Sequence, residues 1–218
     1  MGEYGVEMEI SGPLAMWTRP DTGTHPTSYP VPTWPAAKGI FESIAFYSDA
    51  GAWIRPVKVE ICKRKGDVGG ELSFQKYTTN YRGPLMDGSK GNFQFNALIL
   101  SDVCYRLHGV VENGSGSRLV RGDNPCHALQ AIFMRRLKNG QCYKTPTLGW
   151  NEFVPDYWGP FRNSMQFSEQ TETDVDINED MISVLNRVFG KPVNGTYNPH
   201  FVQGEKAIIK NGVYCYDQ

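Results

Sequence analysis

The order in which strand-like and helix-like periodicities follow one another is the feature that most constrains the fold of this chain. Apolar residues alternate with other residues in 4–10, in 53–61 and within 93–111, which predicts strands. A helical spacing of apolar residues follows Thr33, and a second one lies within 125–138. With a further strand after this second helix, the order is β-α-β-β-α-β. This order predicts an α+β protein with the ferredoxin-like fold that RNA-recognition modules share.

The regions around these strands add two expectations. In the first strand, apolar residues alternate with Glu7 and Glu9, so both carboxylates are expected on a solvent-exposed face. Residues 11–33 form a long connection rich in Gly, Pro, Ser and Thr, and a connection of this length is more often functional than idle. Residues 63–92, rich in Gly, Tyr and Thr, are interpreted as a long hairpin or a mobile insertion.

The second helix has a marked beginning and a marked end. Asn124 is a favoured N-cap, and Pro125 suits the first helical position because it has no N–H to leave unpaired. Asn139 and Gly140 form a C-terminal stop. Cys126 points toward the apolar face, so we interpret it as a core residue rather than a reactive thiol. That face is formed by Leu129, Ile132, Phe133 and Leu137.

His127 lies in the first turn of this helix, on the side opposite the apolar face, together with Ala131, Met134 and Lys138. The first turn of a helix carries unpaired backbone N–H groups and the positive end of the helix dipole, which attract phosphate and favour a neutral imidazole. A neutral imidazole beside a phosphodiester is able to act as a general base in RNA cleavage. The alternative is a solvated surface histidine with no function, which is the commoner outcome at such a position.

The last third of the chain differs in character. Aromatic and turn residues dominate from about residue 145, so we predict a ferredoxin-like domain in 1–144 and a smaller β-rich extension in 145–218. A short amphipathic helix is predicted at 181–189. Asn211 and Gly212 stand between two β-rich runs, which predicts a hairpin with a type I′ turn.

The composition of the 218 residues is that of an ordinary soluble globular protein. No apolar run reaches membrane-spanning length, and the N-terminus lacks the regions of a signal peptide. Five scattered cysteines without a C-x-x-C spacing favour reduced thiols in a cytoplasmic protein and argue against a zinc site. The four histidines are dispersed, so no metal and no other cofactor is expected.

The net charge of −1 hides a segregation of charge along the chain. Residues 169–180 carry six acidic residues and no basic one, whereas 118–144 carry six basic residues and one acidic one. A local basic surface is able to bind phosphate even when the whole chain is slightly acidic. The same charges are also consistent with solvated helix and loop surfaces.

Several stretches resemble one protein family, in order along residues 5–153. They are Met16-Trp-Thr-Arg-Pro20, Ser28-Tyr-Pro-Val-Pro-Thr33, Ala36-Ala-Lys-Gly-Ile-Phe-Glu-Ser-Ile44, His127 through Phe133-Met-Arg-Arg136, Gly140-Gln-Cys142 and Thr147-Leu-Gly-Trp-Asn-Glu-Phe153. In these stretches the chain resembles the CRISPR-associated endoribonucleases of type I-C systems, the Dvulg-type RAMP proteins. The resemblance implies a ferredoxin-like core with a β-rich C-terminal extension and metal-independent cleavage of precursor CRISPR RNA at the base of the repeat hairpin. It also implies that the protein stays on the 5′ handle as a subunit of the surveillance complex.

The family pattern transfers to this sequence with two departures. The family's catalytic histidine falls on His127, but the lysine that usually precedes it is Cys126 here. The tyrosine or histidine that usually follows the first helix is Ala45, with Tyr47 two residues on. The resemblance therefore implies catalysis by His127 and Tyr47, with attack by the ribose 2′-OH and a 2′,3′-cyclic phosphate product. The candidate RNA-binding residues are Arg19, Tyr29, Lys38, Arg121, Arg135, Arg136 and Lys138.

Two other function classes stay open. A binding-only subunit would hold a 5′ handle made by another nuclease, with its own site eroded at Ala45 and Cys126. A metabolic enzyme on a ferredoxin-like fold has no support, because residues 66–70 are not a phosphate loop and the chain has no dinucleotide-binding or Walker motif. Cleavage of repeat RNA that disappears when His127 is replaced would separate these classes.

Overall fold

The computed structural model describes residues 4–46, 51–84, 88–114, 124–187 and 200–216. Its elements are, in chain order, β1 (Gly5–Ala15), α1 (Trp34–Ile44), β2 (Ala52–Arg64), β3 (Phe74–Pro84), β4 (Lys90–Asn113), α2 (Pro125–Lys138), β5 (Tyr157–Gly159), β6 (Thr171–Thr173), β7 (Glu179–Asp180), β8 (Ser183–Arg187), β9 (His200–Gln203), a 3-10 turn (Gly204–Lys206), β10 (Ile208–Ile209) and β11 (Val213–Cys215).

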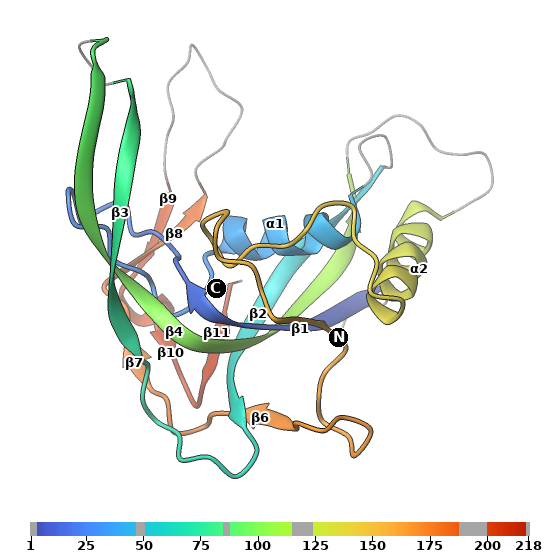
Figure 1. Ribbon diagram of the computed structural model, residues 1–218. Helices are drawn as coiled ribbons and strands as arrows, with labels where there is room; N and C mark the ends of the chain where they lie inside the picture. Colours follow the sequence, from blue (N-terminus) through green and yellow to red (C-terminus); the bar gives the residue numbers. More distant parts are fainter. Residues whose placement is uncertain (1–3, 47–50, 85–87, 115–123, 188–199, 217–218) are drawn as a thin grey trace.

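One curled antiparallel sheet organises the described part of the chain. Its strands run in the order β11-β2-β4-β1-β5, and β3 and β6 pair with β4 and β2 outside this path. The helix α1 connects β1 to β2, α2 connects β4 to β5, and both helices cover the same face of the sheet (Figure 1). The predicted α+β class, with two helices on an antiparallel sheet, is therefore confirmed.

Both helices form where local signals predict them. The side chain of Thr33 accepts a hydrogen bond from the backbone N–H of Ala36 and caps α1. Phe41 of α1 packs on Phe133 of α2, with ring centroids 5.8 Å apart. The face of α1 that lies on the sheet buries Ala37, Ile40, Phe41 and Ile44. The helices are thus fixed to the sheet and to each other by apolar stripes that the sequence already contains.

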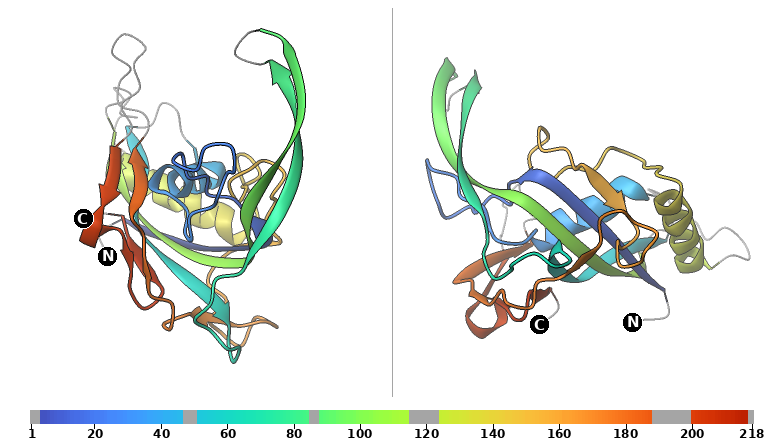
Figure 2. Two further views of the ribbon diagram at one scale, coloured as in Figure 1. Left: turned by 90° about the vertical axis from the view of Figure 1, so that its left-hand side faces the viewer. Right: turned by 60° about the horizontal axis from the view of Figure 1, so that its bottom comes forward.

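A two-stranded arm projects from the sheet (Figures 1 and 2). It is formed by β3 and the first half of β4, which pair from Phe74 opposite Leu100 to Pro84 opposite Lys90. A hairpin is confirmed in this region, but it begins at Phe74 rather than at residue 63, because residues 63 and 64 end β2, and its second strand continues beyond residue 92. Residues 93–111 belong to this single strand, β4, which runs from the arm into the sheet.

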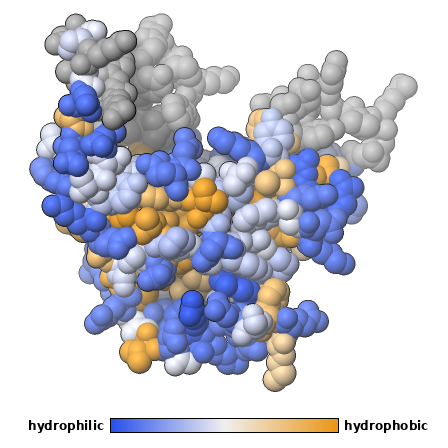
Figure 3. Space-filling view, viewed as in Figure 1, coloured by the Kyte–Doolittle hydropathy of each residue, from blue (hydrophilic) through white to orange (hydrophobic). Residues whose placement is uncertain are grey.

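Aromatic side chains gather at the root of this arm. Trp150 stacks on Phe153 with ring centroids 5.7 Å apart, and both contact Tyr77 of β3. The ring centroid of Phe95 in β4 lies 6.2 Å from that of Trp150. Apolar side chains are also visible on the molecular surface in this region (Figure 3). These rings anchor the arm to the loop that follows α2.

Two of the stretches that carry the family resemblance meet beside this root. The backbone N–H of Met16 donates to the carbonyl of Leu148 over 2.9 Å. Gly149 has a φ of +99°, and a Cβ at this position would lie 1.8 Å from the carbonyl oxygen of Met16. Only glycine fits this close approach of two backbones.

Strands from the last third of the chain join the same sheet. The strand β5 pairs with β1, and β6 and β11 pair with β2. The strand β5 is the one after the second helix that the predicted order requires. The division into a domain of residues 1–144 and an extension of residues 145–218 stays a prediction.

Of two local predictions in this region, one is wrong and one is confirmed. The helix predicted at 181–189 is wrong, because residues 183–187 form β8, which pairs with β9; tertiary pairing overrides a helical spacing of apolar residues here. Asn211 and Gly212 have φ values of 50° and 74°, so the predicted turn is confirmed. Lys210 and Val213 on either side of the turn pair antiparallel through two backbone hydrogen bonds of 3.0 and 2.9 Å, so the hairpin itself is also confirmed. Beyond these residues, β10 pairs with β7 and β11 pairs with β2.

Candidate functional site

The first turn of α2 is closed by its N-cap. The side-chain oxygen of Asn124 accepts hydrogen bonds from the backbone N–H groups of Cys126 (3.0 Å) and His127 (3.4 Å). The N–H of Ala128 donates to the carbonyl of Asn124. The predicted cap is confirmed, but the expectation of unpaired N–H groups around His127 is wrong, because the cap already pairs them. A phosphate beside this turn would therefore be bound by side chains.

The side chain of His127 is exposed, on the side of α2 that faces away from the sheet. The residues predicted to share this side are also exposed, namely Ala131, Met134 and Lys138. The opposite side of α2 buries Cys126, Leu129, Phe133 and Leu137. The predicted division of the helix into two faces is confirmed, and the imidazole is open to a large ligand.

The two positions that depart from the family pattern are both buried. Cys126 is 4% exposed and its thiol donates to the side-chain oxygen of Asn113, so it is the core residue that we expected. Ala45 ends α1 and is 3% exposed. Tyr47 and Arg121, which are candidate site residues, lie outside the described residues.

The C-terminal turn of α2 is cationic. Arg135 and Lys138 are exposed, whereas the guanidinium of Arg136 donates to the carbonyl of Ile44 at the end of α1 over 2.8 Å. Cations in the last turn of a helix stabilise it through the helix dipole. Arg136 also joins the end of α1 to α2, so it has a structural role whether or not it contacts RNA.

Arg19 and Tyr29 lie together in the long connection after β1. Arg19 forms an ion pair with Asp21 over 2.8 Å, and this hydrogen bond raises the pKa of the guanidinium. The guanidinium stands 5.5 Å from the centroid of the Tyr29 ring. Tyr29 is 2% exposed, and burial raises the pKa of its hydroxyl. Tyr29 therefore supports Arg19 from within the core.

Lys38 forms an ion pair with Glu42 on the outer side of α1 and lies 5.9 Å from the ring of Trp53. In the part of the chain that the structure describes, no hydrogen bond or ion pair joins Lys38 or Arg19 to α2. The structure thus brings His127, Arg135 and Lys138 onto one helix and leaves Lys38 and Arg19 on other elements.

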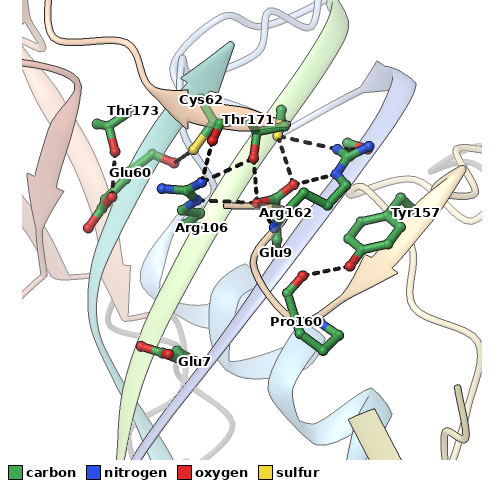
Figure 4. Close-up of polar contacts among 12 residues, drawn as sticks. Glu7, Glu9, Glu60, Cys62, Arg106, Tyr157, Pro160, Arg162, Thr171 and Thr173 are labelled. Carbon is green, nitrogen blue, oxygen red and sulfur yellow. Dashed lines mark hydrogen bonds and ion pairs between the residues drawn. The ribbon is translucent and has the colours of Figure 1, made fainter. Parts of the chain in front are cut away.

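The sheet face away from the helices holds a buried ion cluster that the sequence analysis missed (Figure 4). Glu9 is fully buried and accepts hydrogen bonds from Arg162 (2.6 Å), Arg106 (3.2 Å) and Thr171 (2.7 Å). Burial alone would raise the pKa of this carboxyl, but the hydrogen bonds from Arg162 and Thr171 outweigh it and lower the pKa. The expectation of a solvent-exposed Glu9 is wrong, because the segment that carries Arg162 and Thr171 covers this face.

A second acid, Glu60 of β2, is partly buried on the same side of the sheet. The carboxylate of Glu60 lies 2.9 Å from the imidazole of His108 and accepts hydrogen bonds from Lys58 and Thr173. The contact with His108 lowers the pKa of Glu60 well below its usual range. Together the two clusters fix the segment after β5 against the sheet.

The described residues contain neither a metal-binding cluster nor a helix of membrane-spanning length. Among the described residues, no group of three or more His, Cys, Asp or Glu side chains is arranged to hold a metal ion. No helix in the same residues is long and apolar enough to cross a membrane.

Comparison with known proteins places this geometry in a family. The model of the Cas5d family, described as "CRISPR-associated protein (Cas_Cas5)", matches residues 5–168, which include His127, Glu9, Arg106 and Arg162 but not Thr171. The chain belongs to the Cas5d family. A protein of Mannheimia succiniciproducens named "CRISPR pre-crRNA endoribonuclease Cas5d" is 26% identical over 226 residues, covering 95% of this chain and 92% of the relative. A Thermus thermophilus protein of the same name is 28% identical over 160 residues, covering 71% of this chain and 63% of the relative.

Two solved structures share the Cas5d fold of this chain. "Crystal Structure of CRISPR-associated Protein" matches with a TM-score of 0.68 and 17% identity, covering 98% of this chain and 92% of the other. "The crystal structure of a functionally uncharacterized protein SMU1763c from Streptococcus mutans" matches with a TM-score of 0.64 and 16% identity over the same shares. At this identity the likeness concerns the fold alone.

Proposed function

We propose that this protein is a metal-independent endoribonuclease that cleaves precursor CRISPR RNA at the repeat hairpin. The relatives named as pre-crRNA endoribonucleases support the substrate. The observation that carries the proposal is the exposed imidazole of His127, in the first turn of α2 and inside the region that the family model matches.

The chemistry is an intramolecular transfer within the RNA. His127 accepts the proton of a ribose 2′-OH, whose oxygen attacks the adjacent phosphorus. The bond between that phosphorus and the 5′ oxygen of the next nucleotide breaks, which leaves a 2′,3′-cyclic phosphate and a 5′-OH. Because the backbone N–H groups of the first turn are paired with Asn124, charge on the phosphate is stabilised by side chains. Tyr47, which the resemblance implies for the site, and Arg121, six positions before His127, are the remaining candidates.

Other basic residues bind RNA away from the scissile phosphate. Arg135 and Lys138 extend the exposed side of α2, and Arg19 is held by Tyr29 and Asp21 in the loop after β1. The remaining candidates for phosphate contacts are Lys38 and Arg136. After cleavage the protein stays on the 5′ handle as a subunit of the type I-C surveillance complex.

We infer that the core of the protein is ferredoxin-like. The strand order β5-β1-β4-β2, with α1 and α2 as the two crossing helices, supports this inference. RNA-recognition modules use the same arrangement of elements.

The second candidate function is a non-catalytic subunit that binds the 5′ handle. It is favoured by the burial of Ala45 and Cys126, because neither position offers a functional group to the RNA.

The test compares the wild type with His127→Ala on the repeat RNA of the same system, with and without a chelator. We expect cleavage by the wild type in chelator and no cleavage by His127→Ala, which still binds the RNA. His25→Ala is the matched control, because His25 is also exposed but lies in the loop after β1. Binding without cleavage by every variant supports the non-catalytic subunit, and cleavage that disappears in chelator contradicts the proposed chemistry.

A further inference from the structure

A groove of about 460 Å³ lies beside the C-terminal half of α2. Met134, Arg135 and Lys138 of α2 form one wall, and Glu7 of β1 with Phe161 forms the other. None of the sequence signals points to this groove, although two of its residues, Arg135 and Lys138, are candidate RNA-binding residues.

The groove adjoins an open edge of the sheet. The strand β5 pairs with β1 only at residues 9–11, so residues 5–8 have no strand partner on this edge among the residues that the structure describes. The side chain of Gln130 donates to the carbonyl of Gly5 over 2.8 Å, which places α2 along this edge. A ligand in the groove therefore meets backbone polar groups as well as side chains.

The ring of Phe161 is held in place from behind. The guanidinium of Arg106 lies 4.9 Å from the ring centroid, and the ring of His108 lies at 5.3 Å in an edge arrangement. Arg106 is itself fixed by the buried carboxylate of Glu9. Because Arg106 covers one face of the ring, a flat ligand in the groove would stack on the other face.

The charges of the groove are divided between its walls. Arg135 and Lys138 make the helix side cationic, whereas Glu7 makes the strand side anionic. The exposed side chain of Met134 adds an apolar surface to the helix side. A phosphate fits the helix side and is repelled from the strand side. An aromatic base with N–H donors on its edge fits between Phe161 and Glu7. A nucleotide combines such a phosphate with such a base, so it fits both walls of the groove.

We propose that Phe161 is the stacking platform for an unpaired base of the bound RNA, whose phosphate contacts Arg135 and Lys138. The inference rests on the proposed function and adds a base-binding subsite to it. His127 and Lys138 lie on the same exposed side of α2, and the helical rise separates them by roughly 16 Å. The stacked base is therefore a few nucleotides away from the scissile phosphate.

The experiment uses repeat RNA that carries a 2′-deoxy nucleotide at the cut, so that the RNA stays intact, and a single 2-aminopurine moved along the strand. We expect the wild type to quench 2-aminopurine at one unpaired position a few nucleotides from the cut. Phe161→Leu keeps an apolar side chain but loses the ring, so it should lose this quenching and bind RNA about 5- to 150-fold more weakly. Phe161→Trp should keep both the quenching and the affinity for RNA.

Phe167→Leu is the matched control, because it makes the same change in a ring that packs on Tyr157 outside the groove. An abasic nucleotide at the quenched position removes the base instead of the ring, so it tests the subsite in the wild-type protein and does not depend on how the variant folds. It should weaken binding by the same factor that is expected for Phe161→Leu. The subsite is overturned if the wild type cleaves the all-ribose RNA and binds the 2′-deoxy RNA but quenches 2-aminopurine at no unpaired position, or if the abasic RNA binds as tightly as the RNA with the base present. Failure of the wild type to bind repeat RNA at all overturns the proposed function as well.

Discussion

Replacing Glu9 by glutamine tests the buried ion cluster that fixes the segment after β5. The carboxylate of Glu9 is fully buried and accepts side-chain hydrogen bonds from Arg106, Arg162 and Thr171. Glutamine has nearly the same shape but no charge, so the largely buried guanidinium of Arg106 would lose its counter-ion. Arg162 would keep only its contact with Glu169 at 3.9 Å. Removing one partner of a buried ion pair costs about 3 to 5 kcal/mol of unfolding free energy.

The assay is urea unfolding at neutral pH, supported by thermal melting. In a protein of this length, about 3 to 5 kcal/mol corresponds to a fall of about 6 to 20 °C in the melting temperature. Glu7→Gln is the control, because Glu7 lies two residues earlier on β1 with a side chain that is 45% exposed. The control should change the unfolding free energy by less than about 1 kcal/mol. Equal effects of the two substitutions would refute the reasoning, because they would mean that burial of Glu9 does not matter.

Three further perturbations follow from the structure. Arg136→Ala should lower the unfolding free energy by about 1 to 3 kcal/mol in urea unfolding, because it removes the hydrogen bond that caps α1. Arg135→Ala should leave the unfolding free energy unchanged and reduce the salt dependence of RNA binding by about one ion. The reverse pattern would contradict these roles. The unfolding free energy should fall as the pH drops below 4.5, the ordinary pKa of a glutamate, because Glu60 has a lower pKa in the folded protein. Glu60→Gln should flatten this fall in urea titrations between about pH 5 and pH 3. An unchanged slope in the variant would contradict this role of Glu60. Asn124→Ala should cost about 1 kcal/mol and speed hydrogen exchange at the amide of His127, whereas unchanged exchange would mean that the cap does not order this turn.

The helices were predictable because their signals are local. Thr33 and Asn124 stand at the helix starts, and each apolar stripe lies within one helix, so the sequence predicts the caps, the buried faces and the exposure of His127. The burial of Cys126 follows from the same geometry.

The ion cluster and the groove depend on contacts between distant parts of the chain. Arg162 lies 153 positions after Glu9, so alternation in β1 alone predicts a solvent-exposed carboxylate. In the same way, the pairing of β8 with β9 overrides a helical spacing in 181–189. Phe161 carries no local signal of function, because its role depends on α2 and β1 lying beside it.

The central claim is that the RNA cleaves itself through its own 2′-OH, with His127 as the base. The most direct measurement is cleavage of repeat RNA in which only the nucleotide before the cut has a 2′-deoxy sugar. We expect the wild-type protein to bind this RNA as tightly as the all-ribose RNA without cleaving it, and the all-ribose product to end in a 2′,3′-cyclic phosphate. Cleavage of the 2′-deoxy RNA at the same bond would contradict attack by the 2′-OH.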